Sequence, residues 1–175
     1  MAAALIRAAT VADAAAIREI YGSRHPRPGQ LRIDVPSLDE VERRVTSVLA
    51  AGYPYVVASE GERVCGYAYA SAFRTCLAYR STVEDSVYLA PDAAGRGTGR
   101  LPLTRLLELC TALDFRQMIA VIGDSANAAS IGLHRACGFN RMAVFAATGF
   151  KHGRWVDTVL MQRELGDGAR SLPTA

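Results

Sequence analysis

A strand-like segment, a glycine-rich turn and an apolar helical segment follow one another between residues 82 and 113, and this order constrains the fold more than any other feature of the chain. The strand-like segment carries the carboxylates Glu84 and Asp85. The turn has glycine at every second position from 95 to 99, with Arg96 and Arg100 beside them. Backbone N–H groups in such a turn can converge on phosphate oxygens where a helix begins. The segment therefore predicts a carboxylate next to an anion-binding turn.

The glycine spacing alone is also typical of a flexible loop with solvated arginines, because short glycine motifs occur by chance. The turn lacks the Gly-Lys-Ser/Thr ending of a nucleoside-triphosphate loop and the Gly-x-Gly-x-x-Gly spacing of a dinucleotide site. These two classes of nucleotide site are therefore excluded, and a phosphate bound here belongs to another kind of ligand.

The composition is that of one folded domain. Half of the 175 residues are hydrophobic and 21% are charged, which suits a single core without metals or disulfides. We expect residues 1–165 to form this domain and residues 166–175 to form a flexible tail. No apolar run approaches the ~18 residues needed to span a bilayer, and the opening residues are too soon interrupted by charge to be a signal peptide, which favours the cytoplasm.

The net charge of +3 is dispersed along the chain, so it does not predict a nucleic-acid surface but suits a polyanionic small ligand. The four cysteines, Cys65, Cys76, Cys110 and Cys137, have no C-x-x-C spacing. We therefore expect neither a metal site nor a disulfide framework, and neither a membrane nor a nucleic acid as partner.

Hydrophobic periodicity predicts an α/β (α+β) fold, with a mostly antiparallel sheet and helices interposed. Thr10 with Asp13 and Ser37 with Glu40 are capping signals for the first two helices, and residues 24–36, with three prolines, predict a loop. The predicted helices span residues 10–21, 37–52, 97–113 and 126–137, and the predicted strands span residues 5–7, 55–59, 64–73, 82–90, 118–123, 139–147 and 155–162.

Strict alternation along residues 83–89 places Asp85 on the face that also carries valine and leucine, whereas Glu84, Ser86 and Tyr88 lie on the other face. A buried carboxylate without a partner is costly. Three explanations are open: a bulge after Asp85 that shifts the register, a partner for Asp85 within a site, or a face that is wet at this end.

Motifs distributed over residues 6–165 resemble the GNAT superfamily of acyl-CoA-dependent N-acetyltransferases and, more narrowly, the phosphinothricin and methionine sulfoximine acetyltransferase family. The resemblance implies a GNAT-like mixed sheet with a splayed central strand, acetyl-CoA as co-substrate and a homodimer. The implied reaction transfers an acetyl group to the amino group of a small amino acid or analogue, such as methionine sulfoximine, methionine sulfone or phosphinothricin. The motifs that carry it are residues 78–80, 82–89, 95–100, 127–134 and 149–157.

The resemblance also implies roles for two possible catalytic residues. The transfer needs a base that takes a proton from the acceptor amine and a group that neutralises the departing thiolate. Glu84 matches the general base of the family, and His134 stands where many members carry a tyrosine that protonates the thiolate. Without the resemblance, Glu84 would be interpreted as a surface residue of an edge strand and His134 as a helix residue that packs against the sheet.

Two larger sets of residues are implied to bind the ligands. Asn127 is among them, although alone it would be interpreted as a helix cap. The implied coenzyme-binding residues are Val87, Tyr88, Leu89, Gly95, Arg96, Gly97, Thr98, Gly99, Arg100, Asn127 and Ser130. The implied substrate-binding residues are Arg74, Thr75, Cys76, Tyr79, Asp85 and Ser86. A turn between the last two strands, near the acceptor pocket or a dimer interface, is expected to hold Lys151, His152 and Trp155.

The chain departs from the family on the acceptor side. A second basic residue is common near the position of Cys76, and tryptophan is common at the position of Ser81. Arg74 can supply the charge that recognises an acidic group of the acceptor. Two alternatives remain open: a non-catalytic acyl-CoA-binding sensor, and an acetyltransferase for an unrelated amine such as a protein N-terminus.

Overall fold

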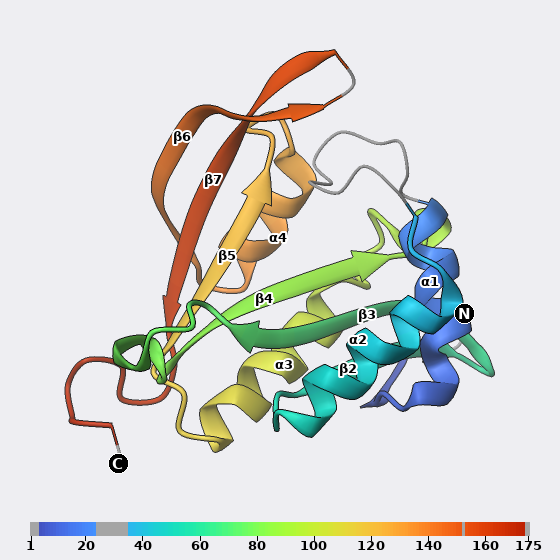
Figure 1. Ribbon diagram of the computed structural model, residues 1–175, viewed down its shortest axis with the longest axis horizontal. Coiled ribbons are helices and arrows are strands. Elements are labelled where there is room, and N and C mark those ends of the chain that lie inside the picture. The colour runs from blue at the N-terminus through green and yellow to red at the C-terminus, as the bar shows by residue number, and fades with distance from the viewer. Residues whose placement is uncertain (1–3, 24–34, 152, 174–175) are drawn as a thin grey trace.

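Seven strands form one mixed sheet, which the computed structural model describes together with its helices for residues 4–23, 35–151 and 153–173 (Figure 1). The order across the sheet is β1-β2-β3-β4-β5-β7-β6. Among the strands described, β4 and β5 pair in parallel and the other neighbours pair antiparallel. This confirms the predicted mostly antiparallel fold. The strands are β1 (Leu5–Ala8), β2 (Tyr55–Glu60), β3 (Arg63–Ala72), β4 (Thr82–Leu89), β5 (Gln117–Gly123), β6 (Asn140–Lys151) and β7 (Arg154–Glu164).

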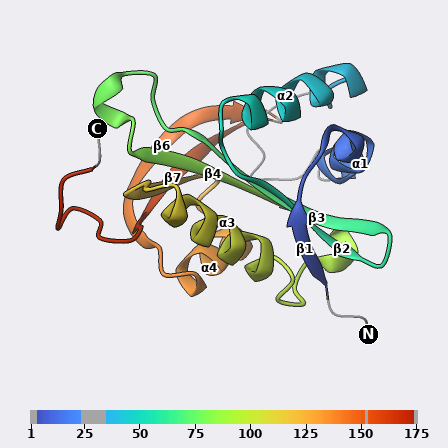
Figure 2. The same cartoon turned by 90° about the horizontal axis from the view of Figure 1, so that it is seen from below.

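Helices cover both faces of the sheet, with α1 and α2 on one face and α3 and α4 on the other (Figure 2). None of the helices in the described ranges is long and apolar enough to cross a membrane. Most of the predicted loop at residues 24–36 lies outside the described residues, as does His152. The helices are α1 (Ala14–Ser23), α2 (Leu38–Ala50), α3 (Arg100–Ala112) and α4 (Ala128–Ala136), with short 3-10 helices η1 (Val11–Asp13), η2 (Leu77–Tyr79) and η3 (Pro91–Ala93).

Each face of the sheet has its own hydrophobic core, because alternate strand residues point to opposite faces. Val83 of β4 packs with Leu103 and Leu106 of α3 on one face. Tyr67 of β3 packs on the other face with residues of α1 and α2, including Val45. The central strand β4 is thus held between two cores, and its two faces present different side chains to different helices.

The helix starts follow the predicted capping signals, with one exception. The Thr10 N–H donates to Asp13 Oδ2 over 2.8 Å, and the Glu40 N–H donates to the Ser37 hydroxyl over 3.2 Å. The helix α3 begins at Arg100 rather than at residue 97. The reason is the backbone of Gly97, whose φ of 78° is incompatible with a right-handed helix.

The central strands β4 and β5 diverge, as Figure 1 shows. Their pairing covers only residues Thr82–Asp85 and Gln117–Ala120. Beyond this point β4 continues to pair with β3 as far as Leu89, while β5 continues to pair with β7 as far as Gly123. This confirms the predicted splay of the central strand and places its vertex at Asp85.

The last two strands are longer than predicted and enclose a shorter turn. The strands pair as far as Lys151 and Arg154, so Lys151 and Trp155 lie in β6 and β7 rather than in the predicted turn. Gly153, with a φ of 73°, permits this tight connection because glycine adopts positive φ without steric cost. The prediction of a broader turn was therefore wrong.

Candidate active site

The glycine-rich turn lies between β4 and α3 and offers several backbone donors. Gly95 and Gly97 have φ angles of 79° and 78°, which bend the chain toward the start of α3. Among the described residues, no hydrogen bond uses the N–H groups of Gly97, Thr98 or Gly99. Arg100 is exposed at the first position of α3. Such an arrangement suits an anionic ligand, because a helix N-terminus and neighbouring N–H groups favour anions.

Leu89, the last residue of β4, fits between two glycines. A Cβ atom at Gly66 would lie 2.6 Å from Leu89 Cδ2, and a Cβ atom at Gly99 would lie 2.8 Å from Leu89 Cδ1. The atom at Gly99 would also lie 3.3 Å from Leu133 Cδ2 of α4. The absence of side chains at these two glycines therefore allows the turn to lie against both β4 and α4.

Glu84 lies next to the vertex of the splay and is half-buried. Its neighbours across the sheet are Ser71 of β3 and Ile119 of β5. Burial raises the pKa of Glu84, and the charge of Asp85 raises it further, although Arg74 acts in the opposite direction. A carboxyl group with a raised pKa beside the point where β4 and β5 diverge is suited to act as a base.

Most of the predicted acceptor residues lie in the segment between β3 and β4. Arg74, Thr75, Cys76 and Tyr79 are all exposed there. Arg74 is close enough to Glu84 for its charge to act on the pKa of that carboxyl. The segment thus brings a cation into the region of the predicted base, which suits an acceptor that carries both an amine and an acidic group.

A row of stacked tyrosines covers the face of the sheet that carries Glu84. This row was not expected from the sequence. The ring centroids of Tyr55 and Tyr69 are 4.9 Å apart, as are those of Tyr67 and Tyr88. Tyr69 lies opposite Ser86, so the row borders the predicted base. The alternation of Tyr67 and Tyr69 along one strand was the available signal, but the stacking depends on a register that the sequence does not show.

Asp85 lies on the opposite face of β4 and binds His134 of α4. Asp85 Oδ2 is 2.9 Å from His134 Nε2, and both side chains are buried. The register between β3 and β4 runs without a shift along the whole of β4. Of the three explanations for Asp85, a partner is therefore the one observed, and neither a bulge nor a wet face is needed. The buried Asp85 carboxylate contacts His134 rather than the exposed acceptor segment.

The loop before α4 is held at both of its ends. The Asn127 side-chain oxygen accepts a hydrogen bond from the Ser130 N–H over 3.2 Å, so Asn127 caps the helix. Arg154 of β7 donates a hydrogen bond to the buried Asp124, which precedes the cap. The sequence did not single out this ion pair. It fixes the entrance to α4, where coenzyme contacts are predicted.

A family of acetyltransferase (GNAT) domains matches residues 6–160 of the chain. The chain belongs to the GNAT acetyltransferase family. It is 50% identical over 163 residues to a phosphinothricin N-acetyltransferase of Alcaligenes faecalis, a match that covers 92% of this chain and 82% of that protein. It is 39% identical over 173 residues to an L-methionine sulfoximine/L-methionine sulfone acetyltransferase of Pseudomonas paraeruginosa, covering 97% of this chain and 99% of that protein.

Solved structures agree with this assignment. The crystal structure of a GNAT superfamily phosphinothricin acetyltransferase from Sinorhizobium meliloti, in complex with acetyl-CoA, matches with a TM-score of 0.93 and 51% identity. The match covers 98% of this chain and 93% of that chain. The predicted family, the predicted GNAT fold and the predicted class of enzyme, an acetyl-CoA-dependent N-acetyltransferase, are therefore confirmed.

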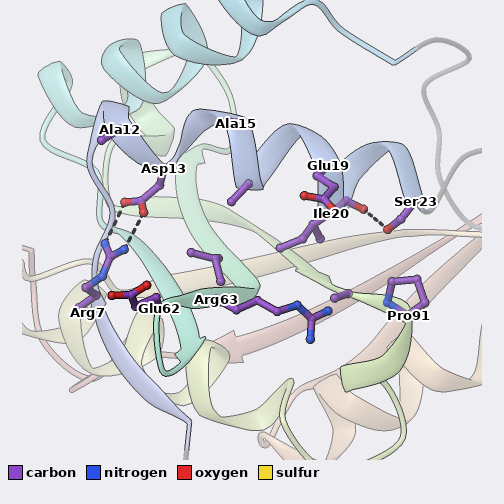
Figure 3. A pocket seen from close by; sticks show the side chains of 13 residues that line it. Arg7, Ala12, Asp13, Ala15, Glu19, Ile20, Ser23, Glu62, Arg63 and Pro91 are labelled. Carbon is purple, nitrogen blue, oxygen red and sulfur yellow. Dashed lines mark hydrogen bonds and ion pairs between the residues drawn. The ribbon is translucent and has the colours of Figure 1, made fainter.

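The GNAT enzyme also has a groove of about 420 Å³ beside α1 (Figure 3). Arg7 and Asp13 line it and form an ion pair with a distance of 2.6 Å. The hydrogen bond from Arg7 is the main cause of a lowered pKa of Asp13. None of the predicted catalytic, coenzyme-binding or acceptor-binding residues lines this groove, so the predicted active site of the GNAT enzyme lies elsewhere, around β4.

Proposed function

We propose that this enzyme transfers the acetyl group of acetyl-CoA to the α-amino group of a small amino acid or analogue of the phosphinothricin, methionine sulfoximine or methionine sulfone type. The observation that carries the proposal is the half-buried Glu84, a carboxyl group with a raised pKa that lies next to the vertex between β4 and β5. The relatives that are 50% and 39% identical carry the names of enzymes for these acceptors, which supports the same class here.

In the proposed reaction each group has one task. Glu84 takes a proton from the acceptor ammonium, so that the amine can attack the thioester. The C–N bond forms as the C–S bond breaks, and the second proton that the nitrogen loses balances the departing thiolate of coenzyme A. The turn at residues 95–100 and the start of α4 bind the coenzyme, whose bound thioester supplies the acetyl group. Arg74 binds the acidic group of the acceptor, while Ser86 and the tyrosine row limit its size. The proposed compartment is the cytoplasm, since the charged co-substrate does not cross membranes unaided.

The proposal predicts release of coenzyme A thiol from acetyl-CoA when a suitable acceptor is added. A panel of phosphinothricin, methionine sulfoximine, methionine sulfone, ordinary amino acids and a peptide with a free N-terminus separates the acceptor classes. We expect thiol release with one or two small analogues and none with the peptide. Release with the peptide alone would favour an acetyltransferase for a protein amine. Coenzyme binding without release in any mixture would favour the sensor.

We also propose that the enzyme is a homodimer, with β6 and β7 at its interface. Phe150 and Trp155 are 59% and 63% exposed, and their rings meet edge to face with centroids 5.2 Å apart. Met142, Val144 and Phe145 of β6 are exposed as well. Exposed apolar side chains on an outer strand favour contact with a second copy.

Replacement of Trp155 by glutamate should convert this dimer to a monomer. A buried charge at an apolar interface costs several kcal/mol unless it is paired. Sedimentation equilibrium measures the change in mass. Leu172→Glu is the matched control, because Leu172 is 89% exposed but lies outside β6 and β7. A wild-type protein that sediments as a monomer, or a Trp155 variant that remains dimeric, would contradict the proposed interface.

A further inference from the structure

The buried contact between Asp85 and His134 joins two elements that lie far apart in the sequence. It links β4 at the vertex of the splay with the last turn of α4. The second carboxylate oxygen, Oδ1 of Asp85, is buried and has no hydrogen-bond partner among the described residues. A buried carboxylate held by a single partner depends strongly on that partner. The contact is therefore energetically important to both side chains.

The two contacts of the His134 ring suit an imidazolium. The Nδ1 atom lies 2.7 Å from the carbonyl oxygen of Ser130, which can only accept a hydrogen bond. The Nε2 atom faces the carboxylate of Asp85. An imidazole that donates to both of these acceptors is an imidazolium, and its contact with Asp85 is then an ion pair. The Ser130 hydroxyl lies farther from Nδ1, at 3.4 Å, than the Ser130 carbonyl oxygen does.

His134 also anchors its helix. The buried residues of α4 are Ile131 and His134, so the imidazole forms a large part of the face that α4 turns to the sheet. The ring meets Phe139 edge to face, with centroids 5.1 Å apart. The coenzyme contacts predicted for α4, at Asn127 and Ser130, lie on the turn that precedes His134. A shift of His134 would therefore move these contacts as well.

We propose that Asp85 is a positioning residue, whose carboxylate holds the imidazolium of His134 and thereby fixes α4 against β4 for coenzyme binding. The inference rests on the proposed function in one respect, namely that acetyl-CoA contacts the start of α4. Both ring nitrogens of His134 face protein groups, so in this arrangement His134 supplies a fixed link between strand and helix rather than a proton for the thiolate.

The link predicts a pH dependence with a definite sign. Burial lowers the pKa of His134, but the hydrogen bond and charge of Asp85 outweigh it and raise the pKa above the usual 6.5. A raised pKa means that the ion pair is complete at low pH and is lost as the pH rises through the pKa of the folded protein. Acetyl-CoA should therefore bind more weakly on the alkaline side.

Other titratable groups near the pair do not obscure this dependence. Cys110 of α3 faces Asp85, and burial together with the charge of Asp85 raises the pKa of its thiol to about 12. Burial also raises the pKa of Cys137, which follows α4. Both thiols thus remain neutral while His134 titrates. Glu84, whose pKa is raised by burial and by the charge of Asp85, lies on the other face of β4 from the pair.

The variant Asp85→Asn tests the inference, because it keeps the shape of the side chain and removes its charge. Calorimetric titration with acetyl-CoA alone, from about pH 6 to about pH 9, spans the titration of a histidine with a raised pKa. We expect the dissociation constant to rise about tenfold at neutral pH, the size of one lost hydrogen bond to a charged group. We also expect the pH dependence of the wild-type constant to disappear.

The control is Asp13→Asn, which removes another buried carboxylate from an ion pair, that with Arg7. It should lower stability but leave the acetyl-CoA dissociation constant and its pH dependence unchanged. In a His134→Gln background, Asp85→Asn should add little, because Asp85 acts through His134. Wild-type affinity and pH dependence in Asp85→Asn would overturn the inference.

A measurement on the wild-type protein guards against a variant that fails to fold. Nitrogen-15 NMR of the imidazole distinguishes an imidazolium from either neutral tautomer. We expect His134 to be an imidazolium at neutral pH, and a neutral ring would overturn the inference. Failure of the proposed function has a different signature, since the wild-type protein would then bind no acetyl-CoA at any pH.

Discussion

Replacement of Glu84 by glutamine should lower kcat for acetyl transfer by about 10²–10⁴-fold, the contribution typical of a general base. Glutamine has nearly the same shape, but its amide cannot take the proton of the acceptor ammonium. Glu84 lies outside the coenzyme turn, so the dissociation constant for acetyl-CoA should stay within about twofold of the wild-type value. Steady-state kinetics with the best acceptor and calorimetry with acetyl-CoA alone measure the two quantities.

The stability of this variant separates a chemical effect from an unfolded protein. Burial and the charge of Asp85 raise the pKa of Glu84, so the folded protein binds the proton of Glu84 more tightly than the unfolded chain does. The charged carboxylate therefore destabilises the fold once the pH exceeds the pKa of Glu84. The neutral glutamine should leave the unfolding free energy unchanged or higher at neutral pH. Chemical denaturation measures it.

The pH profile offers a second check on the same base. In the wild-type enzyme kcat should fall as the pH drops through the pKa of Glu84, at a higher pH than the usual 4.5 of a glutamate. Arg74→Gln should move this limb to higher pH, because Arg74 lowers the pKa. Glu108→Gln, an exposed change on α3, is the matched control and should not shift the pH profile of kcat. A kcat that Glu84→Gln leaves intact would remove Glu84 from the mechanism.

The parts of the site that local sequence determines could be predicted. The alternation of residues 83–89 identified the central strand, and three closely spaced glycines identified the turn, because a strand and a positive φ both leave local signals. The start of α3 was misplaced for a related reason. The helix begins three residues after Gly97, whose left-handed backbone ends the turn. Gly95 and Gly97 adopt positive φ and Gly99 does not, and the sequence does not tell which of the three glycines do so.

The parts that depend on the register and topology could not be predicted. Asp85 and His134 are 49 residues apart, and the sequence around either residue does not indicate that the two are in contact. From the sequence, a partner for Asp85 was one of three open explanations. The tyrosine row has the same origin, since Tyr67 meets Tyr88 only because β3 and β4 pair in one register. The candidate base can thus be identified from the local sequence, whereas the contacts that support it depend on how the strands pair in the folded sheet.

Replacement of Gly99 by valine should weaken acetyl-CoA binding at least about tenfold and lower the unfolding free energy by about 1–3 kcal/mol, as overpacking of a tight contact typically does. The new Cβ atom would lie 2.8 Å from Leu89 Cδ1 and 3.3 Å from Leu133 Cδ2, so the turn must move away from β4 or α4. Leu89 cannot yield toward β3, because it already fills the space that Gly66 leaves there. Any movement that removes the clash therefore displaces the N–H groups that are predicted to bind phosphate.

The matched control for this variant is Gly132→Ala, in α4. A Cβ atom at Gly132 would meet nothing within 4 Å, so alanine should be tolerated and should stabilise the helix by up to about 1 kcal/mol. Calorimetry with acetyl-CoA and thermal unfolding of both variants give the comparison. If Gly99→Val binds acetyl-CoA as the wild-type enzyme does, the turn at residues 95–100 is not the phosphate site. If Gly99→Val binds acetyl-CoA weakly but has the wild-type unfolding free energy, the turn moves without strain. The tight contact with Leu89 then shapes the coenzyme site and does not stabilise the fold.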